Sequence, residues 1–266
     1  MKRVVLVTGG SSGIGRAIVE LFVQKGYEVL AASRSANSIA IEGARNIVLD
    51  VTDAASVQSV MSTIEKDYGA LFALINSAGL GMVGSIEDTT PEELQDLFQT
   101  NLLGVHHMCK YALPLLRKCK RSYIVNITSM AAQMALPYRG IYCASKFAVE
   151  GYTESLSQEV RADGIRAVIV EPGDVLTSIN SNRKVVSNLS PHHAAKQTAV
   201  HRQINREVEL GWRPERIAQA VYDIVQKKEP RLRYRVAGFN AKLAYYLMRL
   251  LPDRWFEQVI MRHYGI

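Results

Sequence analysis

Two residues near the middle of the chain have the types and the spacing for acid–base chemistry. Tyr142 and Lys146 are four residues apart, so on a helix they lie on the same face. A phenol with its ordinary pKa of about 10 is a poor base at neutral pH. An ammonium group beside it favours the phenolate and brings proton transfer closer to the working pH. The same spacing occurs often by chance, so the pair needs support from other residues.

Ser129 and Asn101 supply that support. Ser129 follows an apolar stretch and lies thirteen residues before Tyr142, and Asn101 lies in the preceding helical stretch. Hydroxyl, amide, phenol and ammonium groups together can bind and protonate a polarised oxygen. We therefore predict that Asn101, Ser129, Tyr142 and Lys146 form one catalytic group.

A glycine-rich turn near the N-terminus has the features of a dinucleotide site. Gly9 allows a tight turn after an apolar run, Gly13 lets the backbone approach a pyrophosphate, and Gly15 lets the following helix pack closely. The start of that helix offers free N–H groups and the positive end of its dipole. The residues expected to bind the phosphates are Gly9, Ser11, Ser12, Gly13, Ile14 and Gly15.

The end of the second strand-like run bears on the choice of nucleotide. Folds that bind NAD tend to place an acidic residue there for the ribose 2′-hydroxyl, whereas this chain has Ser33 and Arg34. The guanidinium of Arg34 can pair with a 2′-phosphate, so NADP(H) is expected rather than NAD(H). The alternative is that Arg34 is only a solvated loop residue.

Two later strand ends are also expected to contact the nucleotide. Asp50, followed by Val51, could accept a hydrogen bond from the adenine amino group. Alternatively, Asp50 or Thr52 caps the helix that begins near Asp53. The fourth strand-like run ends at Asn76 and is followed by Ala78 and Gly79. These small residues leave room for a flat ligand.

These residues sit in an alternation of strand-like and helical segments. Short apolar runs separated by helical patterns of this length predict a parallel sheet with helices on both faces, a doubly wound, Rossmann-like α/β fold in a single domain. The strand-like runs are 3–8, 28–32, 46–49, 71–76, 122–128 and 166–171. The helical stretches are 14–25, 53–67, 91–117 and 140–162.

The alternation breaks after residue 172. Residues 178–213 are polar and have no long apolar period, so an irregular substrate loop is predicted there. A helix over 214–228 and a strand over 233–236 follow. The extension 237–266 is expected to form two amphipathic helices divided at Pro252, which act as a substrate cap.

Charge and composition narrow the class of protein. The 266 residues are 48% apolar and carry a net charge of +7. Much of the excess of positive charge lies in residues 231–266, so this terminal segment could bind an anionic membrane surface. The favoured alternative is that it packs over the substrate cleft or against a second subunit. We expect no metal site and no nucleic-acid binding. With no secretory signal and no long apolar run, a cytoplasmic protein is expected.

Taken together, the motifs resemble those of the short-chain dehydrogenase/reductase family over residues 3–236. They are TGGSSGIG (8–15), NSAG (76–79), Asn101 in QTNLLG, Ser129 in NITS, YCASK (142–146) and PGDVLT (172–177). NSAG departs slightly from the more usual NNAG of the family, and the role of Asp174 is open.

The resemblance implies a role for each matching residue. Tyr142 would donate or accept the proton, and Lys146 would also bind the nicotinamide ribose. Ser129 would orient the substrate oxygen, and Asn101 would hold a water in a proton relay. The nicotinamide side of the site would include Pro172, Gly173, Val175 and Thr177.

The terminal region resembles the hydroxysteroid and retinol dehydrogenase branch of the family. This likeness implies a hydrophobic carbonyl or secondary alcohol substrate, such as a steroid, a retinoid or a fatty carbonyl. Together with the cofactor expected from Arg34, it predicts an NADP(H)-dependent oxidoreductase. The resemblance to the family as a whole implies a homodimer or homotetramer through helices 91–117 and 140–162. The alternatives are a catalytically silent NADP(H)-binding sensor or scaffold and, ranked last, a sugar-nucleotide epimerase.

Overall fold

Seven parallel strands form the central sheet, in the order β3-β2-β1-β4-β6-β7-β9. The computed structural model describes residues 2–35, 41–177 and 183–266. The strands are β1 (Val4–Thr8), β2 (Glu28–Ser33), β3 (Ala44–Val48), β4 (Ala73–Asn76), β6 (Ser122–Ile127), β7 (Ile165–Pro172) and β9 (Arg233–Val236). The strand order reverses between β1 and β4, so a crevice is expected at the carboxyl ends of these strands.

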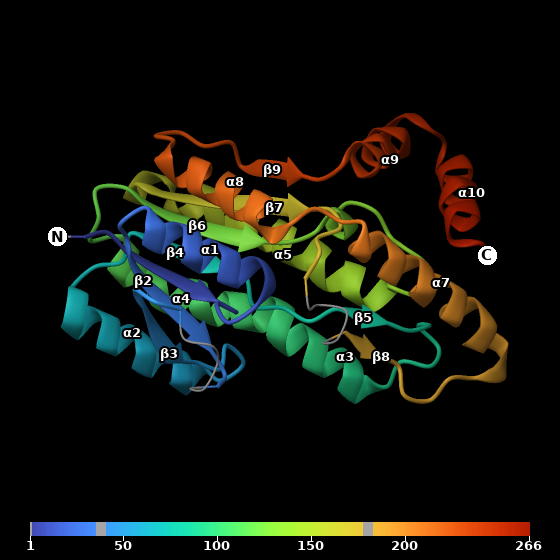
Figure 1. Ribbon diagram of the computed structural model, residues 1–266, viewed down its shortest axis with the longest axis horizontal. Helices are drawn as coiled ribbons and strands as arrows, with labels where there is room; N and C mark the ends of the chain where they lie inside the picture. The colour runs from blue at the N-terminus through green and yellow to red at the C-terminus, as the bar shows by residue number, and fades with distance from the viewer. Residues whose placement is uncertain (1, 36–40, 178–182) are drawn as a thin grey trace.

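Helices cover both faces of the sheet (Figure 1). On one face lie α1 (Gly13–Gln24) and α8 (Pro214–Gln226), and on the other α2 (Ala54–Tyr68), α4 (Gly104–Leu116) and α5 (Gly140–Val160). The inner strands are apolar at nearly every position because both of their faces are buried. The doubly wound parallel architecture predicted from the sequence is therefore confirmed.

One predicted helix is interrupted. The stretch 91–117 forms α3 (Pro91–Phe98), a π-helical turn η1 (Gln99–Leu103) and α4. A capping box between Thr90 and Glu93 starts α3. Turns of the π type within helices are frequent at functional sites, and this one contains Asn101.

The prediction of an irregular loop over 178–213 is wrong for most of that segment. Its residues 178–182 lie outside the described residues. Beyond them, β8 (Lys184–Val185) pairs with β5 (Met82–Val83), and α7 (Pro191–Glu209) has nineteen residues. The buried residues of α7 are Gln197, Val200, Ile204 and Val208, so its apolar face is narrow. Most of its residues are polar, and the helical period of the apolar ones is therefore hard to recognise in the sequence.

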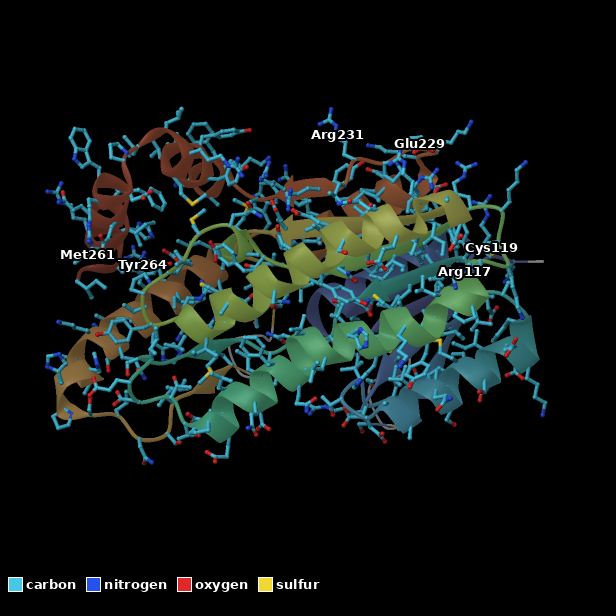
Figure 2. All side chains as sticks on the ribbon, turned by 180° about the vertical axis from the view of Figure 1, so that it is seen from behind. Arg117, Cys119, Glu229, Arg231, Met261 and Tyr264 are labelled. Carbon is cyan, nitrogen blue, oxygen red and sulfur yellow. The ribbon has the colours of Figure 1, made fainter. Side chains whose placement is uncertain are left out.

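The terminal segment forms two helices divided at Pro252, as predicted: α9 (Phe239–Leu250) and α10 (Asp253–Tyr264). They stand at the end of the molecule opposite the N-terminus (Figure 1). Figure 2 shows Tyr264 on the side of α10 that faces the body of the protein and Met261 on its outer side. Tyr264 packs against Val200 and Val208 of α7. No helix in the described ranges is long and apolar enough to cross a membrane.

Candidate active site

A cavity of about 880 Å³ extends from the carboxyl ends of the strands to α9 and α10. It brings together most of the residues predicted for the site. Those on its wall are Gly9, Ser12, Gly13, Ile14, Gly15, Ala78, Gly79, Ser129, Tyr142, Lys146, Pro172, Gly173, Val175 and Thr177. Those that do not line it are Ser11, Ser33, Arg34, Asp50, Val51, Asn76 and Asn101.

The glycine turn at one end of the cavity depends on the absence of side chains. Gly9 has a φ of +65°, and a Cβ there would lie 3.0 Å from the Cα of Ala78. A Cβ on Gly15 would overlap the carbonyl group of Gly9. Ser12, the N-cap residue of α1, forms no capping bond through its side chain. The first N–H groups of α1 and their dipole thus suit a phosphate, and the turn fits the diphosphate of a dinucleotide.

The centre of the cavity is formed by α5 and the end of β6. Tyr142 and Lys146 are only 6% and 7% exposed. Lys146 Nζ donates a hydrogen bond of 3.2 Å to the carbonyl oxygen of Ile127. Burial lowers the pKa of Lys146 from its usual value, while the neighbouring Tyr142 opposes that change. The spacing of four residues therefore places a buried ammonium next to the phenol.

Ser129 follows β6 and caps the short helix η2 (Met130–Ala132). Its Oγ accepts a hydrogen bond of 3.1 Å from the backbone N–H of Ala131. This bond uses the oxygen as an acceptor, so the hydroxyl hydrogen is available to a ligand in the cavity. The geometry suits a group that donates to a substrate oxygen.

Asn101 lies behind the cavity wall and joins three elements. Its Oδ1 accepts from Leu80 N at 2.8 Å, and its Nδ2 donates to Leu80 O and to Ser145 Oγ, both at 3.0 Å. A Cβ on Gly79 would lie 3.3 Å from Asn101 Oδ1 and 3.4 Å from Lys146 Nζ. Asn101 therefore holds the loop after β4 against α5, and its action through a water stays a prediction.

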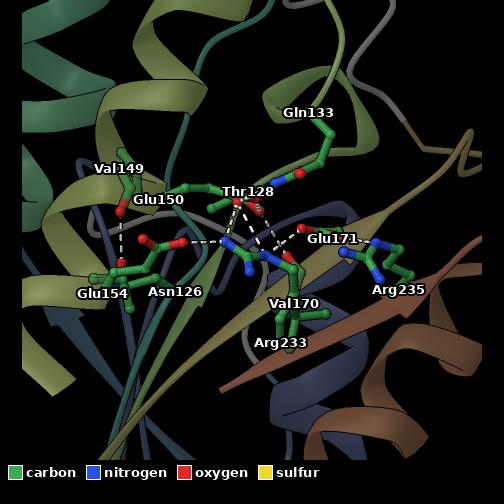
Figure 3. A network of polar contacts seen from close by, with 11 residues as sticks. Asn126, Thr128, Gln133, Val149, Glu150, Glu154, Val170, Glu171, Arg233 and Arg235 are labelled. Atoms are coloured by element: carbon green, nitrogen blue, oxygen red, sulfur yellow. Dashed lines mark hydrogen bonds and ion pairs between the residues drawn. The ribbon is translucent and has the colours of Figure 1, made fainter. Parts of the chain in front are cut away.

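Sequence reasoning missed a network of ion pairs that joins α5, β7 and β9 (Figure 3). Arg233 of β9 pairs with Glu150 at 2.8 Å, with Glu154 at 2.5 Å and with Glu171 at 2.7 Å. Arg235 pairs with Glu171 at 2.9 Å. Burial, followed by repulsion from Glu150, raises the pKa of Glu171 to about 8. A glutamate at the end of a fully buried strand was the available sequence signal.

The same network fixes both sides of the Ser129 turn. Glu150 lies one helical turn after Lys146, and Thr128 Oγ1 donates to it at 3.1 Å. Gln133, beyond η2, donates to the other oxygen of Glu150. Because α5 also carries Tyr142, these bonds set the position of Ser129 relative to the phenol.

The residues predicted to contact the adenosine half lie outside the cavity. Arg34 is exposed at the carboxyl end of β2, and Ser33 Oγ donates to Ser35 O at 3.1 Å. Asp50 Oδ1 accepts from the N–H and the hydroxyl of Thr52, at 2.9 and 2.8 Å.

One prediction at these strand ends needs correction. The cap of α2 is Asp53, which accepts from Ala55 N, so the alternative that Asp50 or Thr52 caps this helix is wrong. Asn76 Nδ2 donates to Asn126 Oδ1 at 2.8 Å, and the side chain is buried within the sheet. The side chain of Asn76 therefore links β4 to β6, and its contact with the cofactor stays a prediction.

The far end of the cavity contains residues that no motif indicated. Two guanidinium groups, Arg139 and Arg183, lie on its wall. The apolar residues there are Leu80, Met130, Met134, Leu136, Val208, Leu243, Leu247, Val259 and Ile260. They come from segments far apart in the chain, so no local spacing could have grouped them.

The short chain dehydrogenase family model matches residues 3–186, which include the glycine turn and the Tyr142–Lys146 pair. This chain belongs to the short-chain dehydrogenase/reductase family. It is an oxidoreductase, and its fold is the one that the sequence predicted.

Relatives match this dehydrogenase over nearly its whole length. It is 35% identical over 266 residues to the 3-ketodihydrosphingosine reductase of Bacteroides thetaiotaomicron, covering 99% of this chain and 98% of the relative. It is 30% identical over 277 residues to an NADPH-dependent 3-dehydrocapnine reductase of Ornithobacterium rhinotracheale, covering 98% and 96%. A crystal structure of a short-chain dehydrogenase from Streptomyces avermitilis superposes with a TM-score of 0.81 at 31% identity, covering 97% and 95%.

Proposed function

We propose that this enzyme uses NADPH to reduce the keto group of a lipid with a long alkyl chain. One observation carries the proposal: the cavity continues from Tyr142 to an apolar end between α9 and α10. Leu243 and Val259 line it and are also 43% exposed, so it opens to the surface between these two helices. Two whole-length relatives are named a 3-ketodihydrosphingosine reductase and an NADPH-dependent 3-dehydrocapnine reductase, and these names support a reductase.

The proposed mechanism assigns one task to each central residue. When bound, NADPH would supply a hydride to the carbonyl carbon. Ser129 donates a hydrogen bond to the carbonyl oxygen, and Tyr142 gives that oxygen its proton. Lys146 stabilises the phenolate that remains, and it holds the nicotinamide ribose. Asn101 and the Glu150–Arg233 network position these groups without touching the substrate.

The preference for NADPH is proposed from the end of β2. Arg34 is exposed there, and no acidic side chain stands at Ser33 to repel a 2′-phosphate. The strand lies directly beside β1, whose carboxyl end leads into the glycine turn. A forked, permanently charged donor at this position can bind the 2′-phosphate through paired hydrogen bonds.

The proposal is tested by following NADPH oxidation with ketones of two classes. A long-chain 3-keto lipid should give a kcat/KM at least about tenfold above that of a short-chain ketone, because its chain fills the apolar end. Mass spectrometry should identify the product as the secondary alcohol. Reduction of short polar ketones with equal efficiency would contradict the assignment.

A membrane contact is a further proposal for the terminal helices. These helices expose Phe239, Tyr246, Leu250 and Trp255, and they also carry exposed arginines at 249, 254 and 262. Aromatic and basic groups in this arrangement suit an anionic bilayer, from which a lipid substrate could enter between α9 and α10. Cosedimentation with phosphatidylglycerol vesicles, absent for Trp255→Ser, would test the contact.

A homodimer or homotetramer is also proposed, through η1, α4 and α5. Leu103 and Phe147 are apolar side chains on these elements that remain 39% and 44% exposed. Such residues are candidates for burial in an interface. Light scattering should report a dimer or tetramer, and Phe147→Glu should shift the mass towards that of one chain.

A further inference from the structure

Arg139 and Arg183 place two positive charges in the substrate part of the cavity. Arg139 is the residue before α5, and its Cζ lies 5.0 Å from the centre of the Tyr142 ring. Arg183 precedes β8, and its side chain passes Gly81. Both line the cavity together with Tyr142. The charges are therefore close to the group that would protonate the ketone.

Neither guanidinium is neutralised by the protein residues that the structure describes. No salt bridge in the described ranges includes Arg139 or Arg183. Arg139 Nε is buried and has no hydrogen-bond partner among them. Arg183 Nη1 donates to the neutral amide of Asn205 at 2.9 Å. A buried charge without a counter-ion is costly, so such a pair is a candidate for binding an anion.

Asp174 and Glu207 lie on the same wall, but in the described ranges neither forms a salt bridge with Arg139 or Arg183. Glu207 is bonded instead to His263 at 2.6 Å and to Gln203 at 2.9 Å. Burial, followed by repulsion from Glu207, raises the pKa of Asp174. Burial, followed by repulsion from Arg139, lowers the pKa of Arg183 to about 10, which leaves it charged at neutral pH.

Tyr264 and Lys146 are two further ionisable groups on the cavity wall. Burial raises the pKa of Tyr264 to about 12, so its hydroxyl stays neutral and can only donate or accept hydrogen bonds. Lys146 adds positive charge on the cofactor side of Tyr142. The substrate part of the cavity therefore holds two guanidinium groups that have no salt-bridge partner in the described ranges, beside apolar walls.

We propose that Arg139 and Arg183 bind an oxyanion at the head of the substrate, so that the preferred ketone is a lipid with a sulfonate, phosphate or carboxylate group near its keto carbon. Planar guanidinium groups match the paired oxygens of such groups. The head would lie beside Tyr142, and the alkyl chain would lie along the apolar end. This inference rests on the proposed reduction of a long-chain ketone.

The experiment compares two 3-keto lipids with the same alkyl chain, one with a sulfonate head and one with a hydroxyl head. Wild-type enzyme should show a kcat/KM on the order of 10- to 100-fold higher for the sulfonate lipid, the effect of one or two charge-assisted hydrogen bonds. Arg183→Gln should abolish most of that ratio, and Arg183→Lys should retain part of it. Arg206→Gln, which removes an exposed charge near Asn205, should leave the ratio unchanged.

Arg139→Gln is the second variant. Because Arg139 contacts the Tyr142 ring, turnover of both lipids is expected to fall, and the ratio between them is the informative quantity. The ratio should fall as it does for Arg183→Gln. Equal kcat/KM values for both lipids in the wild type, or an unchanged ratio in both variants, would overturn the anion site.

A binding measurement separates this proposal from the proposed reduction. Hexadecyl phosphate has the anionic head and the chain but no ketone. It should raise the Tm of the wild type more than hexadecanol does, and this difference should vanish in Arg183→Gln. If the difference is present but no long-chain ketone is reduced, the proposed reduction fails and the anion site stands. If the difference is absent in the wild type, the anion site fails.

Discussion

The two ends of the cavity are built in different ways. The cofactor end consists of strand termini and the turns that follow them, so its residues occur in short motifs such as 8–15 and 76–79. The substrate end combines the η2 region, α7, α9 and α10, whose residues are far apart in the chain. Motifs at one end therefore identify the reaction, while packing at the other end decides which molecule undergoes it.

The largest expected effect is on kcat and comes from Tyr142, which lies between the cofactor end and the substrate end of the cavity. Tyr142→Phe removes the proton donor but keeps the ring beside Arg139. We expect kcat to fall by about 10²- to 10⁴-fold, the usual contribution of a general acid. NADPH binding, followed by fluorescence titration, should change little. A variant that retains most of its turnover would contradict the assignment of Tyr142.

The next effect tests the substrate end alone. Leu247→Trp fills part of the apolar wall on α9, so kcat/KM for a long-chain ketone should fall by about tenfold or more. The fall for a short-chain ketone should be much smaller, because that substrate does not reach α9. Leu250→Trp is the matched control, since Leu250 is on the same helix, is 79% exposed and does not line the cavity. Equal losses for both ketones would indicate a general disturbance of the fold.

A substitution at the cofactor end should change the affinity for NADPH relative to NADH and should leave the preference among lipid substrates unchanged. Arg34→Asp replaces a cation with an acid beside the proposed 2′-phosphate, so the Kd for NADPH should rise by about 10- to 100-fold. The Kd for NADH should stay the same or fall. Lys25→Asp makes the same charge change at the other end of α1 and serves as the control. If NADPH affinity does not fall, the account of Arg34 is wrong.

The smallest expected effect is on the free energy of unfolding, and it comes from Glu171 in the network with Arg233 and Arg235. The pKa of Glu171 is about 8, against an ordinary value of 4.5, because burial and Glu150 outweigh the attraction of Arg233 and Arg235. The folded state thus binds this proton more tightly than the unfolded state. The stabilisation from that proton is fully present below pH 4.5 and is lost as the pH rises towards 8.

Glu171→Gln should remove this dependence on pH. Between pH 5 and pH 8, the free energy of unfolding of the wild type should fall by about 1–3 kcal/mol more than that of the variant. Urea denaturation at several pH values measures the difference. Glu154→Gln, which removes the more exposed partner of Arg233, should keep the wild-type slope. Identical slopes for the wild type and Glu171→Gln would contradict the raised pKa.

The sequence predicted those parts of the fold and site that depend on local pattern. Strand β9 has the predicted bounds, and Tyr142 and Lys146 share a helix face because helical geometry places residues four apart together. The buried strands were recognisable because nearly every position in them is apolar.

The remaining features depend on contacts between distant segments. Helix α7 was missed because most of its surface stays in water. The π-helical turn was missed because no local spacing indicates that Asn101 bonds to Leu80. Arg139 and Arg183 lie far apart in the chain, so no local spacing indicated that they line one cavity. The interruption of a helix and the pairing of distant charges are decided by tertiary packing, which a local pattern does not record.

The dependence of kcat/KM on alkyl chain length tests the central claim most directly. With NADPH and a series of 3-keto lipids that differ only in chain length, each added methylene group should raise kcat/KM by about fourfold until the apolar end is filled, since burying one contributes about 0.8 kcal/mol. The value should then level off, and the plateau should come at a shorter chain in Leu247→Trp. A kcat/KM that does not change with chain length in the wild type would contradict the assignment of the substrate end to an alkyl chain.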